Sequence, residues 1–194
     1  MKPWYDSRVV IGNSFDAVRA TVGLMAASIR RSSKDVRIRQ HAARLAARAR
    51  PKDYLGQLAE IWKDFVKNWR YVRDPLRYEM IENSPRAVYQ YILGGNGGLG
   101  DGRGGSDCDG ATIGVCSLCD AIGFPCRIVT MAVSGLQPGR SMSHVYAQVF
   151  INGVWITVDP VLYPNGTLGD EAPASRRAYW NLSGRMIGNV GNFR

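Results

Sequence analysis

A predicted β-hairpin with a two-residue turn constrains the fold of this chain more than any other feature. Residues 144–151 and 154–159 both read as strands, and Asn152-Gly153 joins them. This dipeptide is the strongest short-range signal for a hairpin turn. A slip of one residue would move every side chain to the other face of the sheet. The turn therefore predicts the register, and with it which side chains meet.

The predicted register places His144 and Asp159 on one face. Side chains alternate along a strand, so His144 and Tyr146 point the same way, and Asp159 stands opposite Tyr146. Such diagonal neighbours are separated by roughly 7–8 Å at Cα, which lets the carboxylate reach and orient the imidazole. Taken singly, a histidine is most often structural, and an Asp before Pro160 is a common turn residue.

Cys108 completes a candidate catalytic set. It lies between Asp107 and Asp109 at the first turn of a helix predicted over about 108–122. Free N–H groups and the positive end of the helix dipole stabilise a thiolate there. An imidazolium would stabilise it further, then protonate the leaving amine, while the Asp fixes the tautomer. We therefore predict cysteine-dependent acyl transfer on a peptide or amide bond through a Cys-His-Asp triad.

The oxyanion formed in such a reaction needs hydrogen-bond donors. The backbone N–H of Cys108 is one, and Trp69 and Tyr71, at the end of a helix predicted over 52–71, are candidates for another. The chemistry requires no organic cofactor or metal. A zinc site built from all four cysteines has spacings that do not match a zinc ribbon. Those cysteines are Cys108, Cys116, Cys119 and Cys126.

The remaining patterns predict an α+β domain. Further helices are expected at 14–31 and 35–49 and a strand at 126–133, with a loop-rich tail that holds one short element at 175–182. The nucleophile helix is expected to pack on an antiparallel sheet. Eight glycines crowd residues 94–105, a loop that would serve as a lid or be a tolerated insertion. Its G-x-G-x-x-G matches lack a βαβ context and do not indicate a dinucleotide site.

Positive charge is concentrated near the N-terminus. Residues 1–50 hold eleven Lys/Arg and three Asp/Glu, whereas residues 51–194 hold fourteen and thirteen. We predict a basic helical extension at 1–50 and a catalytic domain at 51–194. The extension is a solvated face or a docking surface for an acidic protein or another polyanion. Nucleic acid is less favoured because no aromatic residues interleave the charges. A catalytically silent module that docks through these helices is the alternative function.

No apolar run is long enough to span a membrane. The first residues, Met-Lys-Pro-Trp-Tyr-Asp, lack the apolar run of a secretory signal. Synthesis in a reducing cytoplasm is therefore the expectation.

Several motifs together resemble the transglutaminase-like superfamily, a branch of the papain-like fold. They are Trp69-Arg70-Tyr71, Asp107-Cys108-Asp109, residues 121–127, His144-Val145-Tyr146 and residues 153–160. The resemblance implies a papain-like core, a Cys-His-Asp set and a peptide or protein substrate. The family includes peptidases, amidases, cross-linking enzymes and inactive members. This chain departs from the pattern at Gly110, where many relatives carry an acidic or polar residue. Compact members that resemble this chain look like proteins encoded by bacteria or their phages, so the resemblance suggests a role in a virion or at a cell wall.

Overall fold

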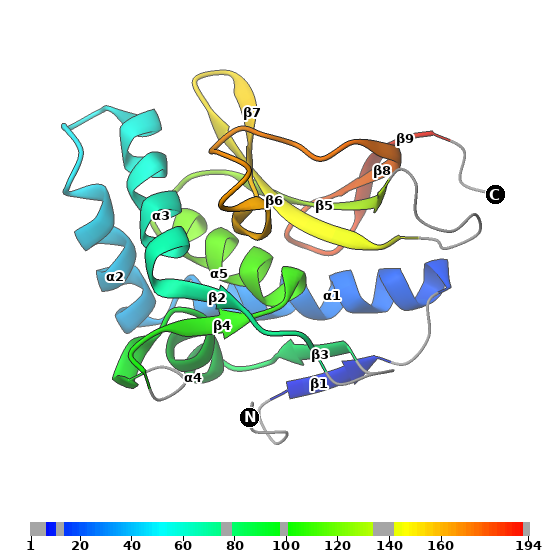
Figure 1. The fold of residues 1–194 in the computed structure, drawn as a ribbon, viewed down its shortest axis with the longest axis horizontal. Helices are drawn as coiled ribbons and strands as arrows, with labels where there is room; N and C mark the ends of the chain where they lie inside the picture. Colours follow the sequence, from blue (N-terminus) through cyan, green and yellow to red (C-terminus); the bar gives the residue numbers. More distant parts are fainter. Residues whose placement is uncertain (1–6, 11–13, 75–78, 98–100, 134–141, 192–194) are drawn as a thin grey trace.

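A computed structural model describes residues 7–10, 14–74, 79–97, 101–133 and 142–191 (Figure 1). The fold is α+β, as predicted, with helices packed against one face of an antiparallel sheet. The helices are α1 (Phe15–Ser32), α2 (Val36–Ala46), α3 (Tyr54–Asn68), α4 (Pro85–Ala87) and α5 (Cys108–Ala121), with the helical turns η2 (Val88–Ile92), η3 (Gly95–Gly97) and η4 (Pro160–Leu162). The strands are β1 (Ser7–Val10), β2 (Trp69–Tyr71), β3 (Glu79–Glu82), β4 (Gly104–Ser106), β5 (Cys126–Val133), β6 (His144–Ile151), β7 (Val154–Val158), β8 (Ala174–Trp180) and β9 (Met186–Val190).

The main sheet has the order β7-β6-β5-β8-β9. Its β6–β7 hairpin turns at Asn152 and Gly153, both with positive φ (50° and 89°), the backbone conformation of a type I′ turn. Ile151 pairs with Val154, so the predicted register is confirmed. The same turn therefore fixes which residues of β6 face the helices.

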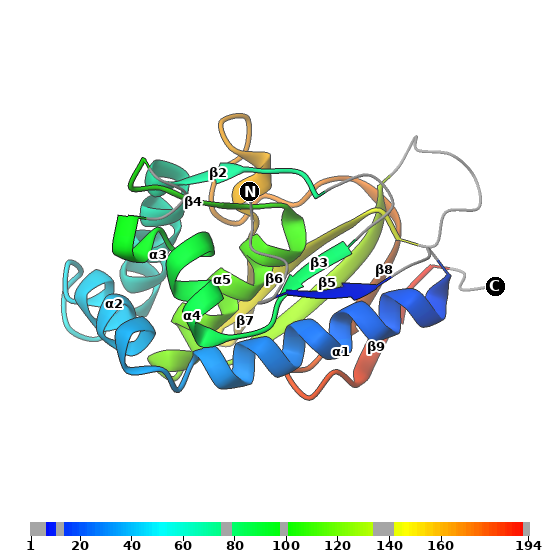
Figure 2. The same ribbon diagram turned by 90° about the horizontal axis from the view of Figure 1, so that it is seen from below.

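Helix α5 occupies the centre of the molecule (Figure 1 and Figure 2). All its residues from Asp109 to Cys119 are buried, as expected for a helix covered on every side. The sheet covers one side of it, and α1, α2 and α3 cover the others. This position holds the start of α5 rigidly against its neighbours.

The basic N-terminal helices share the core with α5. Val22, Met25 and Ile29 of α1 and Ile38 and Leu45 of α2 are at most 1% exposed and belong to the same apolar cluster as α5. The division of the chain at residue 50 stays a prediction. Removing residues 1–50 would uncover part of this core.

The helix predicted over 52–71 is too long. It ends at Asn68, and Trp69–Tyr71 continues as β2, which pairs in parallel with Gly104–Ser106 of β4. This pairing recruits the last part of the glycine-rich loop into a sheet. A Cβ on Gly104 would lie 1.7 Å from the carbonyl oxygen of Ile92, so only glycine fits there. Residues 98–100 of that loop lie outside the described residues.

The tail also differs from the prediction. Where one short element was expected at 175–182, the chain forms β8 and then β9. Every residue of β9 is exposed, so the strand lacks the apolar–polar alternation that reveals a half-buried strand. Within the described residues, no helix has the length and apolar character needed to cross a membrane.

An ion pair between α2 and α3 gives a prediction about acid stability. Nε2 of His41 lies 3.0 Å from Oδ2 of Asp64, and Asn68 donates to Oδ1 at 2.9 Å. Burial raises the pKa of Asp64, but the hydrogen bonds and charges of His41, Asn68 and Arg48 outweigh burial and bring the pKa below its ordinary value. The charged carboxylate therefore stabilises the fold above the unfolded-state pKa of about 3.9, and this contribution disappears as pH falls through the lower folded-state pKa.

We expect Asp64→Asn to lower the free energy of unfolding by about 1–3 kcal/mol at pH 7. Urea denaturation of both proteins between pH 7 and pH 3 measures the effect. The difference between them should shrink below about pH 4, where the carboxylate of the unfolded wild type takes up a proton, and disappear below the lowered folded-state pKa. An equal difference at every pH would show that the charge of Asp64 is not what stabilises the fold.

Candidate active site

Cys108 is the first residue of α5, and Asp107 is its N-cap. The thiol is partly exposed, whereas Cys116, Cys119 and Cys126 are free and buried. Cys108 and Cys116 are eight residues apart on one helix, or about 12 Å along its axis. One zinc ion cannot reach both, so the four cysteines do not form a single site.

The buried thiols have a different environment from Cys108. A hydrogen bond with Cys126, together with burial, raises the pKa of Cys116 well above its ordinary value. The hydrogen bond of Cys126 with Cys116 lowers its pKa, but a hydrogen bond with Cys119 and burial outweigh this effect and raise the pKa well above its ordinary value. These two thiols stay protonated at neutral pH. Only Cys108 combines access to solvent with a helix N-terminus.

His144 and Asp159 are in contact, as the hairpin register predicted. His144 Nε2 lies 2.7 Å from Asp159 Oδ2, and their side chains are 11% and 3% exposed. Asp159 Oδ1 accepts from the N–H of Val161 at 3.2 Å, which ties the carboxylate to η4. An ionised carboxylate can only accept hydrogen bonds. Nε2 therefore carries the hydrogen, and Nδ1 is left as the basic nitrogen.

The two candidate donors, Trp69 and Tyr71, have different surroundings. Trp69 Nε1 donates to Ser106 Oγ at 3.1 Å, so its N–H supports the strand before Cys108. Tyr71 pairs with Ser106 in the β2–β4 ladder and is 52% exposed. The buried part of the side chain loses hydration, which raises the pKa of Tyr71 to about 12. The negative charges of ionised Cys108 and Asp107 raise it further toward this value. Its hydroxyl is thus a protonated donor near Cys108.

An acidic cluster lies under the start of α5. Carboxylate oxygens of Asp74, Asp107 and Asp109 lie within 4.8 Å of one another, and among the described residues only this group has the spacing of metal ligands. Two of the three already cap backbone groups: Asp74 accepts from the N–H of Met80, and Asp109 from that of Gly110 at 2.5 Å. Negative charge beside a thiol opposes its ionisation. A thiolate at Cys108 therefore depends on a nearby cation such as an imidazolium.

The sequence reading missed Glu82, which comes from β3. A Cβ on Gly110 would lie 2.4 Å from Ser106 Cβ and 3.2 Å from Glu82 Oε2. Glu82 is 1% exposed, so its carboxylate occupies the space beside position 110. A side chain at position 110 would therefore meet both Ser106 and Glu82. No local signal could have found Glu82, because β3 is distant in the sequence.

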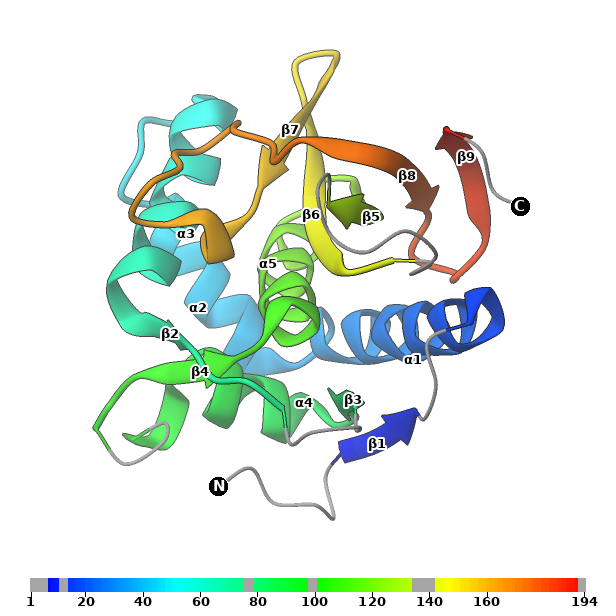
Figure 3. The same ribbon diagram turned by 45° about the vertical axis from the view of Figure 1, so that its right-hand side comes forward.

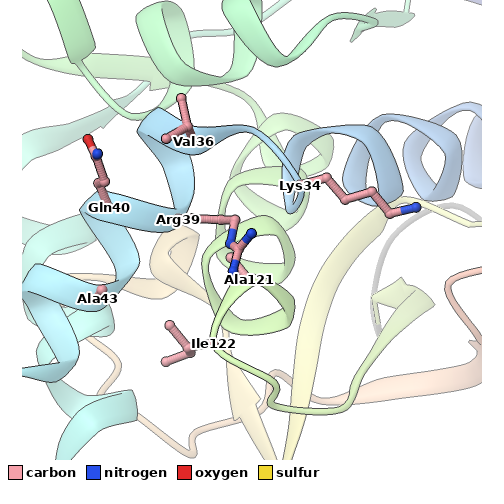
Figure 4. Close-up of a pocket in the computed structure, with 7 residues that line it drawn as sticks. All are labelled: Lys34, Val36, Arg39, Gln40, Ala43, Ala121 and Ile122. Carbon is pink, nitrogen blue, oxygen red and sulfur yellow. The ribbon is translucent and has the colours of Figure 1, made fainter.

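A separate cavity lies at the other end of α5 (Figure 4). It has a volume of about 350 Å³. It is lined by residues of α2, by Lys34 just before that helix and by the C-terminal end of α5. The lining residues are Lys34, Val36, Arg39, Gln40, Ala43, Ala121 and Ile122. Fourteen residues of α5 place it roughly 20 Å from Cys108. It is therefore not the site that holds Cys108.

Comparisons with known proteins concern the family and the fold of this chain. The model of a family described as the transglutaminase-like superfamily matches residues 40–160. Among solved structures, a candidate protease from Parabacteroides distasonis ATCC 8503 is 12% identical with a TM-score of 0.54, over 87% of this chain and 30% of that one. A candidate cysteine protease from Cytophaga hutchinsonii is 15% identical with a TM-score of 0.46, over 96% and 58%.

A structure of the Rad4/XPC nucleotide excision repair complex is also similar, at 13% identity and a TM-score of 0.49, over 90% of this chain and 50% of that one. The chain thus spans between about a third and three fifths of these structures' own lengths. No curated protein sequence matches it. At these identities the structural likeness concerns the fold.

Proposed function

Because the chain belongs to the transglutaminase-like superfamily, we propose that it is a cysteine-dependent enzyme that transfers acyl groups from peptide or amide bonds. Cys108, His144 and Asp159 are its proposed catalytic residues. The observation that carries this proposal is the 2.7 Å bond from His144 Nε2 to Asp159. That bond fixes the tautomer that leaves Nδ1 free to take a proton from a thiol.

The proposed reaction has two steps. Cys108 transfers its proton to Nδ1 of His144, and the thiolate attacks the carbonyl carbon to give a tetrahedral oxyanion. The imidazolium then protonates the departing amine, which breaks the C–N bond and leaves a thioester on Cys108. Water attack on the thioester gives hydrolysis, and attack by an amine gives transamidation. Acylation is the same in both, and we favour hydrolysis because water is always present.

The oxyanion would be stabilised by the backbone N–H of Cys108 and the hydroxyl of Tyr71. The raised pKa of Tyr71 supports this role because it keeps the phenol protonated. Trp69 is the weaker candidate, since its N–H already donates to Ser106.

Alkylation by iodoacetamide across pH 4–9 tests the thiolate. An ordinary thiol is about one part in a thousand ionised at pH 5.5. We expect Cys108 alone to react fast there and to lose this advantage in His144→Ala, with each cysteine resolved by peptide mass spectrometry. His41→Ala is the matched control, because His41 also contacts an aspartate through Nε2. If Cys108 reacts as an ordinary thiol in the wild type, the enzyme hypothesis is wrong.

Tyr71→Phe tests the oxyanion donor. With p-nitrophenyl acetate as the acyl donor, we expect acylation of Cys108 to slow by about 10- to 1000-fold. Alkylation by iodoacetamide forms no oxyanion and should keep its rate. Trp69→Phe should leave the ratio of the two rates unchanged. A selective loss of acylation in Trp69→Phe, with none in Tyr71→Phe, would assign the donor to Trp69 instead.

A second candidate function is docking of an acidic protein partner, and the cavity at the end of α5 favours it. Lys34 and Arg39 line that cavity without an ion pair to any residue that the structure describes. Val36, Ala43 and Ile122 supply apolar surface beside them (Figure 4). Unpaired cations next to apolar side chains suit a segment that mixes carboxylates with aliphatic residues.

A labelled peptide of alternating glutamate and leucine is the probe for docking. We expect it to bind the full chain more tightly at low salt, and more tightly than its glutamine analogue. Arg39→Glu should weaken binding about tenfold. Arg44→Glu, on the same helix outside the cavity, should not. Equal loss in both variants would indicate diffuse attraction to the basic surface and would contradict a docking site.

A further inference from the structure

The main sheet carries a second small core, separate from the apolar cluster that contains α5. Its buried residues are Val129, Met131 and Tyr146. Ala172, in the connection between η4 and β8, and Ala174, the first residue of β8, pack against it. Figure 3 shows this connection passing over β7 and β6 before it enters β8. Asp159 is the N-cap of η4, which leads into this connection, so the segment that follows the histidine's carboxylate partner also covers this core.

Tyr146 connects this core to His144. The two residues are two positions apart on β6, so their side chains share a face. Their rings are stacked, with centroids 6.0 Å apart and planes 24° apart. Tyr146 is 1% exposed, so its ring has little freedom to move. Asp159 holds the edge of the imidazole through one nitrogen. The Tyr146 ring lies beside the imidazole with its plane nearly parallel, and so limits the tilting of the imidazole that the Asp159 bond leaves free.

Glu171 fixes the hydroxyl of Tyr146. The hydroxyl donates to Glu171 Oε1, which also accepts from Gln148 Nε2 at 3.1 Å. Glu171 Oε2 lies 3.1 Å from a guanidinium nitrogen of Arg177. Burial, and then the hydrogen bond to Glu171, raises the pKa of Tyr146 far above its ordinary value. The phenol of Tyr146 therefore stays protonated and donates to Glu171. The Glu171 carboxylate thus binds three side chains, those of Tyr146 and Gln148 from β6 and of Arg177 from β8.

Gln148 is itself fixed in orientation. Its Oε1 accepts from Arg127 Nε at 2.8 Å, so its Nε2 must face Thr157 and Glu171. The guanidinium of Arg127 lies 4.2 Å from the ring centroids of both Trp155 and Tyr179. A chain of oriented groups thus extends from the aromatic pair to the ring that contacts His144.

We propose that Tyr146 and Glu171 are positioning residues that hold the His144 imidazole in the plane needed for proton exchange with Cys108. The inference rests on the proposed function for its catalytic meaning. Two residues after β7 would then restrain the imidazole. Asp159 binds its Nε2 directly, and Glu171 holds the Tyr146 ring that lies beside it. In this proposal Tyr146 and Glu171 act through His144 and not on the thiol or the substrate directly.

The direct test is NMR of the imidazole nitrogens in the full chain. The sequence has two histidines, so His41 is an internal reference in every spectrum. In Tyr146→Phe and Glu171→Gln we expect the His144 nitrogen signals to shift or broaden while those of His41 stay in place. Tyr179→Phe removes a hydroxyl from the same face without touching this chain of hydrogen bonds and should match the wild type. Unchanged His144 signals in both variants would overturn the inference.

The rate at which iodoacetamide alkylates Cys108 at pH 5.5 shows whether the orientation of His144 affects the thiol. We expect Tyr146→Phe and Glu171→Gln to slow it by about 2- to 12-fold, the equivalent of one net hydrogen bond. Melting temperatures close to the wild type exclude unfolding as the cause. If His144 responds but wild-type Cys108 is unreactive, the positioning role stands and the proposed enzyme fails. If wild-type Cys108 is reactive and both variants keep its rate, the enzyme stands and the positioning role fails.

Discussion

The burial of α5 is the constraint on which the rest of the molecule depends. Its side chains from Asp109 to Cys119 are all enclosed by the sheet and by α1, α2 and α3. A helix held in this way cannot move its first turn without disturbing the whole core. The dipole and free N–H groups at Cys108 therefore act at a fixed place, in surroundings where charges interact more strongly than in water.

That position alone does not favour a thiolate. Asp107 and Asp109 flank Cys108, and Asp74 and Glu82 approach the same turn. Their negative charge opposes the helix dipole, so the two local influences on the thiol have opposite signs. The histidine would then decide the ionisation, which makes the orientation of its ring important. The groups that orient His144 therefore matter to the thiol as much as the groups beside Cys108.

The sequence could predict those parts of the site that local rules determine. The Asn152-Gly153 turn determined the register of β6 and β7, and a one-residue slip would have separated His144 from Asp159. Contacts between distant segments escaped prediction. The parallel pairing of β2 with β4, the approach of Glu82 and the bond from Tyr146 to Glu171 all depend on where separate elements pack. Neither periodicity nor turn chemistry encodes such contacts.

The four cysteines show how strongly location determines chemistry. All lie within nineteen residues and carry the same thiol. Three are buried among apolar side chains, where loss of a proton would leave an unsolvated charge, as the raised pKa values of Cys116 and Cys126 reflect. The fourth is partly exposed at a helix start, beside a strand that presents Tyr71. The reactivity proposed for Cys108 thus depends on its place in the fold, and the buried cysteines of the same protein supply the reference against which it can be measured.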